Sequence, residues 1–254
     1  MENEKVCLIY QPCGLGDILF IQKIVNHWLE KGFRVIIPVV YEFEWLNDYI
    51  DGVEFVSWGD SVRKLTHKDG LPDTIDFPYK DRYDPYTPSV VTDDFVYYNL
   101  FTEPKGPVMG YKYTIADMDY SDWSDHLKFN RNKEREDELF YNVLGLTDDE
   151  EYVFVNRTYQ TRPNTLNYDR ISNHPNNYGG KKVIELSIMD GYTLFDWLKV
   201  VENASEIHMI ESSMNYVLET KQVDLKATVL NLYSRVNNFC EVDYLFKVNW
   251  NYIT

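Results

Sequence analysis

The residues with the clearest capacity for chemistry form a glycine loop near the start of the chain, Gly14-Leu15-Gly16-Asp17. The loop follows an apolar run over Val6–Ile9 and leads into an amphipathic segment. Strand, glycine turn and helix in this order are typical of an open α/β sheet, whose ligands bind at the carboxyl ends of the strands. The glycines let a ligand approach the main chain closely. The Asp17 carboxylate can serve catalysis, cap the free amides of the first helical turn, or do both.

This loop differs from two common nucleotide-binding glycine motifs. The dinucleotide fingerprint requires a third glycine where this sequence has Leu19, and no Gly-Lys-Ser/Thr follows as in a P-loop. An NAD-dependent enzyme such as a nucleotide-sugar epimerase is therefore disfavoured.

The amino-acid composition of the chain argues against some classes of binding partner. A chain of 254 residues with 44% hydrophobic residues indicates a folded protein of one large or two small domains. Its net charge of −16 argues against nucleic acid or an anionic membrane as the main partner. A phosphate-bearing ligand must then be held locally, by helix amides and a few cations. The acidic start and the absence of a long apolar stretch predict no signal sequence, no transmembrane segment and a cytoplasmic location.

Metal ligands are not predicted. The cysteines lack metal spacing, and their odd number makes a disulfide framework improbable. No second histidine stands at i+4 to suggest a zinc site, and His208 has the pattern of a packed core residue. The acidic residues of the segment 117–125 could hold a divalent ion against a diphosphate, but a solvated acidic loop is the favoured interpretation.

Two runs of alternating strands and helices are expected. In the first, strands at 33–40 and 53–58 follow the glycine loop and its helix, and right-handed crossovers make them parallel. Residues 59–125 form a looser, proline-rich region in which 90–96 supplies another strand or a short helix. A helix at 133–144 and an acidic linker precede the second run. That run has strands at 152–155, 182–186, 207–210 and 227–232 and a helix at 194–201 capped by Thr193.

The order of these pieces resembles glycosyltransferases of the GT-B type, and most closely the heptosyltransferase-like glycosyltransferase family 9. GLGDILF at 14–20 is similar to the family's opening Gly-Asp loop, and VLNLYSR at 229–235 to its final strand. The segment 194–219 resembles the amphipathic helix, short strand and Ser/Thr helix start of the family's second domain. The resemblance implies two Rossmann-like α/β domains facing across a cleft. Residues 1–147 would form the acceptor side and 148–254 the nucleotide-sugar donor side.

The resemblance also implies an activity, the transfer of a sugar from a nucleotide-sugar to an acceptor hydroxyl with inversion and without metal. Asp17 would be the general base, and Gly14 and Gly16 would line the acceptor loop. The nucleotide-sugar is a co-substrate, no other cofactor is implied, and the acceptor is a carbohydrate or glycolipid. The residues implied in donor binding are Arg157, Glu185, Ser212, Ser213 and Arg235, with Arg162 as a further cation.

Each of these donor residues has a plainer interpretation. The serines fit an ordinary helix cap, and the arginines fit surface ion pairs. A short chain, Met214 in place of the usual small residue, and a missing helical histidine favour a second hypothesis. On that hypothesis the protein is a non-catalytic Rossmann-like module that binds a nucleotide or sugar.

Overall fold

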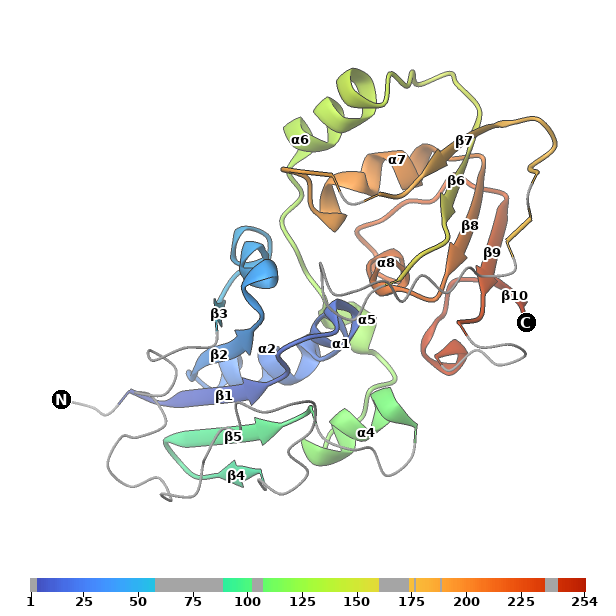
Figure 1. The fold of residues 1–254 in the computed structure, drawn as a ribbon. Helices are drawn as coiled ribbons and strands as arrows, with labels where there is room; N and C mark the ends of the chain where they lie inside the picture. Colours follow the sequence, from blue (N-terminus) through green and yellow to red (C-terminus); the bar gives the residue numbers. More distant parts are fainter. Residues whose placement is uncertain are drawn as a thin grey trace. The chain divides into compact units, whose positions relative to one another are not determined.

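The computed structural model describes residues 4–57, 89–101, 107–159, 174–175, 177–187, 189–235 and 242–254. The chain divides into two compact units, Met1–Phe129 and Asn130–Thr254. In the described residues each unit has its own five-stranded sheet, and no strand of one sheet pairs with the other (Figure 1). The predicted pair of α/β units is confirmed.

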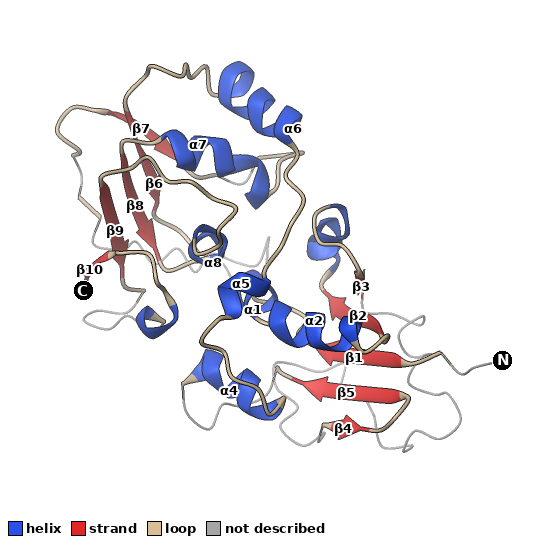
Figure 2. Cartoon of the chain, turned by 180° about the vertical axis from the view of Figure 1, so that it is seen from behind, coloured by secondary structure: helices blue, strands red, loops and turns tan. Residues whose placement is uncertain are grey.

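The first unit alternates strands and helices from its first residues onward. Its elements are β1 (Val6–Tyr10), α1 (Leu15–Phe20), α2 (Gln22–Glu30), β2 (Arg34–Val39), the 3₁₀ helix η1 (Tyr41–Asp48), β3 (Val53–Ser57), β4 (Val90–Val91), β5 (Phe95–Asn99), α4 (Val108–Ile115) and α5 (Trp123–His126). Helices α1 and α2 lie on one face of the sheet (Figure 2).

The first sheet has the order β3-β2-β1-β5-β4. Strands β1, β2, β3 and β5 are parallel, and β4 pairs antiparallel with β5. After β3 the chain returns to the other side of β1, so the winding direction reverses between β1 and β5. In open α/β sheets ligands bind outside the carboxyl ends of the strands at such a reversal point.

Apolar side chains explain why β1 is central. Its first four residues, Val6–Ile9, are all buried, which fits a parallel strand covered on both faces. Of the two structures expected at 90–96, a strand or a short helix, the strand is what the residues form, as the antiparallel pair β4 and β5. The described part of the proline-rich region was predicted to be loop, but it also contains α4 and α5. The aromatic ring of Tyr113 in α4 packs on that of Phe20, with centroids 4.9 Å apart, and this tertiary contact stabilises a helix that local sequence signals do not mark.

The second unit repeats the α/β alternation. Its elements are α6 (Lys133–Asp137), the π-helix η2 (Glu138–Val143), β6 (Tyr152–Asn156), β7 (Lys182–Glu185), the 3₁₀ helix η3 (Leu194–Trp197), α7 (Leu198–Asn203), β8 (Glu206–Ile210), α8 (Ser213–Leu218), β9 (Val229–Tyr233), the 3₁₀ helix η4 (Asp243–Leu245) and β10 (Asn251–Ile253). Thr193 is the N-cap of η3, as predicted.

All the neighbouring strands of the second sheet are parallel, in the order β10-β9-β8-β6-β7. The winding direction reverses between β6 and β8, which makes their carboxyl ends the expected ligand site of this unit. Strand β10 was not predicted, because three residues are too short for a pattern of alternation to be recognised.

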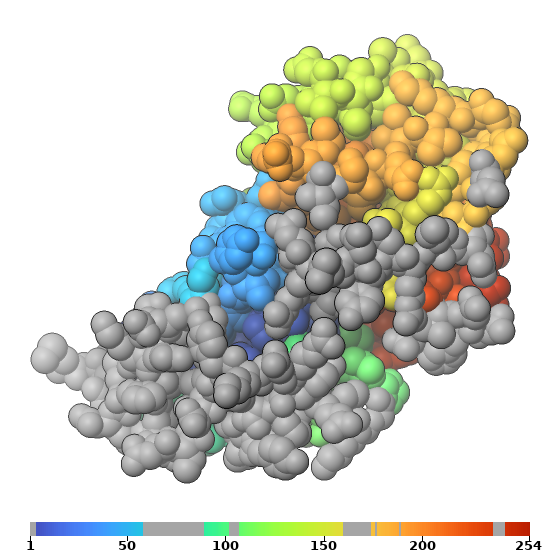
Figure 3. Space-filling view, in the orientation of Figure 1, coloured from blue at the N-terminus to red at the C-terminus, as the bar shows by residue number. Residues whose placement is uncertain are grey.

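The helical segment 133–143 packs with the second unit, although the sequence placed it in the first domain. Figure 3 shows α6 in yellow-green against the orange atoms of η3 and α7. Arg131 explains this division, since its guanidinium reaches Glu136 at 2.8 Å and Glu202 of α7 at 2.7 Å. These interactions join the start of α6 to the second sheet's helical layer, so the two units divide after Phe129.

Replacement of Arg131 by alanine should destabilise the second unit strongly. Glu136 is 1% exposed and would lose its buried partner, keeping only the exposed Lys133, and breaking a buried ion pair typically costs about 3–5 kcal/mol. Urea unfolding of the variant measures this loss. Lys133→Ala is the control, because the side chain of Lys133 is 63% exposed and lies 3.5 Å from Glu136. Equal stability losses in the two variants would contradict the proposed anchoring role of Arg131.

Candidate functional site

The glycine loop of the first unit starts α1 in a way that fixes Asp17. Gly14 is the N-cap, with a φ of 78° that favours glycine, and it makes no side-chain capping bond. Asp17 is the third residue of the helix and not its cap, so the capping interpretation was wrong. A methyl group on Gly14 would overlap Oδ2 of Asp17. The loop therefore needs glycine for its backbone angle and also for the space that the carboxylate occupies.

A buried lysine holds this carboxylate. Lys112, from α4, places its Nζ 3.0 Å from Oδ1 of Asp17. The same Nζ donates to Oε1 of Gln11 at 2.7 Å and to the carbonyl oxygen of Leu100 at 2.9 Å. Gln11 directly follows β1 and Leu100 directly follows β5, so Lys112 lies at the reversal point of the first sheet. This buried polar cluster therefore occupies the place where an open α/β sheet binds ligands.

The two charges of this pair differ in their exposure. The side chain of Lys112 is 6% exposed, whereas that of Asp17 is 29% exposed. The ammonium is therefore sealed among its acceptors, while the carboxylate remains accessible to a ligand. An accessible carboxylate, oriented by a buried cation, is suited to accept a proton from a bound hydroxyl.

Sequence reasoning did not identify Lys112 or Gln11. A signal was present, because Lys112 follows Met109 by three residues and precedes Tyr113, and all three are buried. A lysine in the buried stripe of a helix requires buried acceptors. The sequence does not show where those acceptors come from, since Gln11 lies 101 positions away.

In the second unit, Arg157 and Glu185 lie together at the carboxyl ends of β6 and β7. The guanidinium of Arg157 forms an ion pair with the carboxylate of Glu185 and stands 5.7 Å from the ring centroid of Tyr178. The side chains of Arg157 and Glu185 are 28% and 45% exposed. The ion-pair interpretation of Arg157 is therefore what the structure shows, and the pair remains open to a ligand.

Ser212 and Asn156 connect the next two strand ends. Nδ2 of Asn156, the last residue of β6, donates to Oγ of Ser212 at 3.0 Å, across the reversal point between β6 and β8. The Ser212 amide donates to Oδ1 of Asn215 at 2.7 Å, which makes Ser212 the N-cap of α8. Ser213 is the first residue of that helix and is partly exposed. The capping interpretation thus applies to Ser212.

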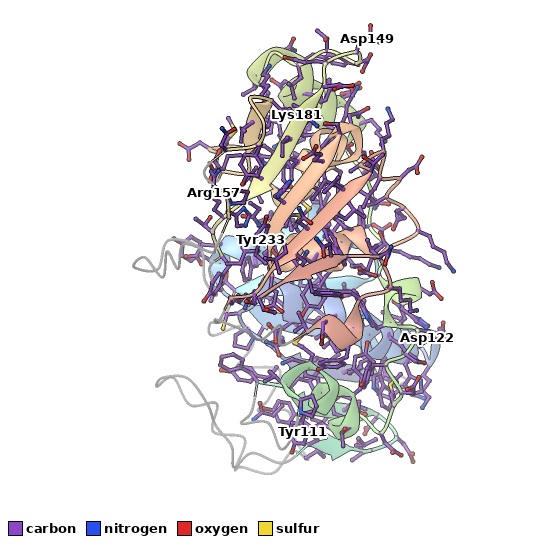
Figure 4. All side chains as sticks on the ribbon, turned by 90° about the vertical axis from the view of Figure 1, so that its right-hand side faces the viewer. Tyr111, Asp122, Asp149, Arg157, Lys181 and Tyr233 are labelled. Carbon is purple, nitrogen blue, oxygen red and sulfur yellow. The ribbon has the colours of Figure 1, made fainter. Side chains whose placement is uncertain are left out.

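Arg235 extends this row to β9. Its Nε donates to the carbonyl oxygen of Glu211, which precedes Ser212, at 2.6 Å, and its guanidinium lies 4.2 Å from the ring centroid of Tyr159. Figure 4 shows Arg157 and Tyr233 toward one end of the second sheet and Lys181 toward the other. All five predicted donor residues therefore fall along the carboxyl edge of one sheet. The further cation, Arg162, lies outside the described residues.

Beside this edge lies a cluster of buried histidines and tyrosines. His208 of β8 contacts the hydroxyl of Tyr233 through Nδ1 at 2.9 Å, and His174 stacks on the Tyr233 ring at 4.0 Å. Burial lowers the pKa of His174 to about 3, and the nearby charge of Arg157 contributes. Burial also lowers the pKa of His208, although its contact with Glu206 opposes the shift. Both rings are therefore neutral at pH 7, and His208 is a core residue as predicted.

The described residues also bear on metal binding and membrane insertion. Among the described residues, no three His, Cys, Asp or Glu side chains gather as ligands for a metal ion. In the acidic segment 117–125, Asp122 pairs with Lys23 and with His126. None of the described helices has the length and apolar character needed to cross a bilayer.

Comparison with known proteins identifies a similar fold. The chain resembles a crystal structure described as the glycosyl transferase family 9 from Veillonella parvula DSM 2008, with a TM-score of 0.54 and 12% sequence identity. The match covers 100% of this chain and 87% of that chain. No protein-family model and no curated protein matches the sequence. At this identity the likeness is one of fold.

Gly14→Ala should displace the Asp17 carboxylate. Gly32→Ala is a matched control, because Gly32 has a φ of 79° and nothing within 4 Å of an added Cβ. Both variants should lose about 1–2 kcal/mol from the left-handed backbone angle. Only Gly14→Ala should also separate Asp17 from Lys112, which crystal structures of the two variants would reveal. An unmoved Asp17 in the Gly14 variant would contradict this account.

The histidine cluster predicts a loss of stability in acid. The folded-state pKa values of His174 and His208 lie below the value of about 6.5 expected in the unfolded chain. Stability is therefore complete above about pH 6.5 and falls as the pH drops toward 3, because the unfolded chain binds more protons. The urea midpoint should decrease between pH 7 and pH 5. His174→Gln should reduce that dependence by up to about 1.4 kcal/mol per pH unit, and an unchanged pH slope would contradict the assignment.

Proposed function

We propose that this protein is a glycosyltransferase that moves a sugar from a nucleotide-sugar to an acceptor hydroxyl, with inversion and without a metal ion. The observation that carries the proposal is the accessible Asp17 carboxylate, held by buried Lys112 at the reversal point of the first sheet. The fold's similarity to a family 9 glycosyltransferase along the whole chain supports the same activity.

On this proposal the first unit binds the acceptor. Asp17 removes the proton of the acceptor hydroxyl as that oxygen attacks the anomeric carbon of the donor sugar. Gly14 and Gly16 let the acceptor approach the loop because neither residue carries a side chain. The bond from the anomeric carbon to the diphosphate breaks, and its electron pair leaves with the phosphate.

The second unit would bind the donor along its carboxyl edge. Arg157 and Arg235 supply cations for the diphosphate, and a guanidinium is suited to bidentate contacts with phosphate oxygens. Ser213, at the start of α8, adds a hydroxyl beside them. Glu185 is placed to accept hydrogen bonds from ribose hydroxyls, since a carboxylate is an acceptor only. Local cations of this kind are needed in a chain with a net charge of −16.

A second candidate function is a binding module without turnover. Departures from the family pattern favour it: Met214 stands in place of the usual small residue, and the helical histidine is missing. The two candidates differ in one measurable outcome. An enzyme releases nucleoside diphosphate from its donor, with water as a slow acceptor, whereas a binding module shifts the melting temperature with a ligand but releases nothing.

Asp17→Asn tests the proposed base. A panel of ADP-, GDP-, UDP- and TDP-sugars is incubated with the protein, and release of nucleoside diphosphate is measured. The variant should lose roughly 10²–10⁴-fold in rate, because the amide cannot accept a proton. Its affinity for the nucleoside diphosphate should change little, because Asp17 belongs to the first unit.

Asp122→Asn is the control, because Asp122 is also an aspartate of the first unit paired with a lysine, yet it lies outside the glycine loop. It should retain the wild-type rate. Wild-type release by Asp17→Asn would remove the catalytic assignment, and no release from any donor would favour the binding module.

A further inference from the structure

The partners of the Lys112 ammonium all belong to the first unit. Its Nζ donates to Gln11 and Leu100 at 2.7 and 2.9 Å and forms an ion pair with Asp17 at 3.0 Å. An ammonium has three N–H donors and no acceptor. Lys112 therefore cannot take a proton itself, and its charge is compensated by Asp17.

Two of these acceptors belong to the sheet, which makes the position of the ammonium rigid. The Leu100 carbonyl is at the end of β5, and the Leu100 amide donates to the carbonyl of Tyr10 in β1 at 3.1 Å. The Gln11 side chain is itself fixed, because its Nε2 donates to the carbonyl of Cys13 at 2.7 Å. Asp17 is thus the charged one of the three partners, and its side chain is 29% exposed.

Burial of a cation at this place is costly, and an apolar side chain of similar volume would often be at least as stabilising. Lys112 is 5% exposed, and Asp17 is the carboxylate that balances it. The arrangement gives the two carboxylate oxygens of Asp17 different surroundings. Oδ1 forms the ion pair with Lys112, and Oδ2 lies over Gly14, where a Cβ would collide with it.

We propose that Lys112 is a positioning residue that holds Oδ1 of Asp17 so that Oδ2 receives the acceptor's proton. This inference rests on the proposed function. The proton passes from the acceptor hydroxyl to Oδ2 while the acceptor oxygen forms its bond to the anomeric carbon. The sugar–diphosphate bond breaks with its electron pair on the phosphate. Lys112 keeps its three protons throughout.

A double-mutant cycle between Lys112→Met and Asp17→Asn tests the role. The probe is the nucleotide-sugar panel, with release of nucleoside diphosphate as the signal. In the wild-type background Lys112→Met should lower kcat about 10–100-fold and leave KM for the donor within about twofold, since a positioning residue acts on the transition state. In the Asp17→Asn background the same change should cause no further loss, because Lys112 acts through Asp17.

Lys23→Met is the control. Lys23 is also a lysine of the first unit paired with an aspartate, Asp122, and its side chain is 16% exposed. This variant should keep the wild-type kcat. If Lys112→Met fails to fold, Lys112→Gln replaces it in the cycle, because the amide still donates to the Leu100 carbonyl.

The outcomes separate this inference from the proposed function. An equal loss in both backgrounds, or a wild-type kcat in Lys112→Met, would overturn the positioning role and leave Asp17 as the base. A wild-type rate in Asp17→Asn would overturn the proposed function itself. If no donor turns over, the proposed function fails and this inference fails with it.

Discussion

A buried ammonium group requires hydrogen-bond acceptors and a compensating negative charge, and this requirement organises the ligand edge of the first sheet. Lys112 meets it with hydrogen bonds to oxygens at the ends of β1 and β5 and with an ion pair to Asp17 of α1. These three segments are far apart in sequence and meet only when the sheet has formed. The position of Asp17 is consequently a property of the whole unit. The same contacts explain why α4, which has few local helix signals, has a defined place at the carboxyl edge of the sheet.

The reversal point of the second sheet carries different side chains. Between β6 and β8 a neutral hydrogen bond joins Asn156 to Ser212, and the charged groups stand farther out, as the pair of Arg157 and Glu185. A neutral pair at the reversal point costs little to bury, whereas exposed cations remain available to an anionic ligand. The two sheets therefore have related topologies but different charged groups at their edges: a carboxylate held by a buried lysine in the first, and partly exposed guanidinium groups, one of them paired with Glu185, in the second. This contrast supports the proposed separation of roles between the two units.

Much of the fold was predictable because it depends on periodicity. The apolar runs that became β1, β2 and β6 are buried on both faces, and this leaves a continuous hydrophobic pattern in the sequence. The missed elements α4, α5 and β10 depend on tertiary contacts: Tyr113 of α4 packs on Phe20, and β10 pairs with β9. The helix at 133–143 was recognised, but its unit was not, because the bond between Arg131 and Glu202 spans 71 positions.

The candidate site divides in the same way. Local sequence was sufficient to indicate Asp17 in a glycine loop and polar residues after each strand of the second sheet, because parallel strands bring their carboxyl ends to one edge. The interaction partners of these residues, and which residue caps the helix, followed only from the tertiary structure. It placed Gly14, and not Asp17, at the helix cap, paired Arg157 with Glu185, and brought Lys112 to Asp17. The reason is physical: residue type and spacing fix which groups face an edge, but the partner of each charge depends on which distant segment is packed against it.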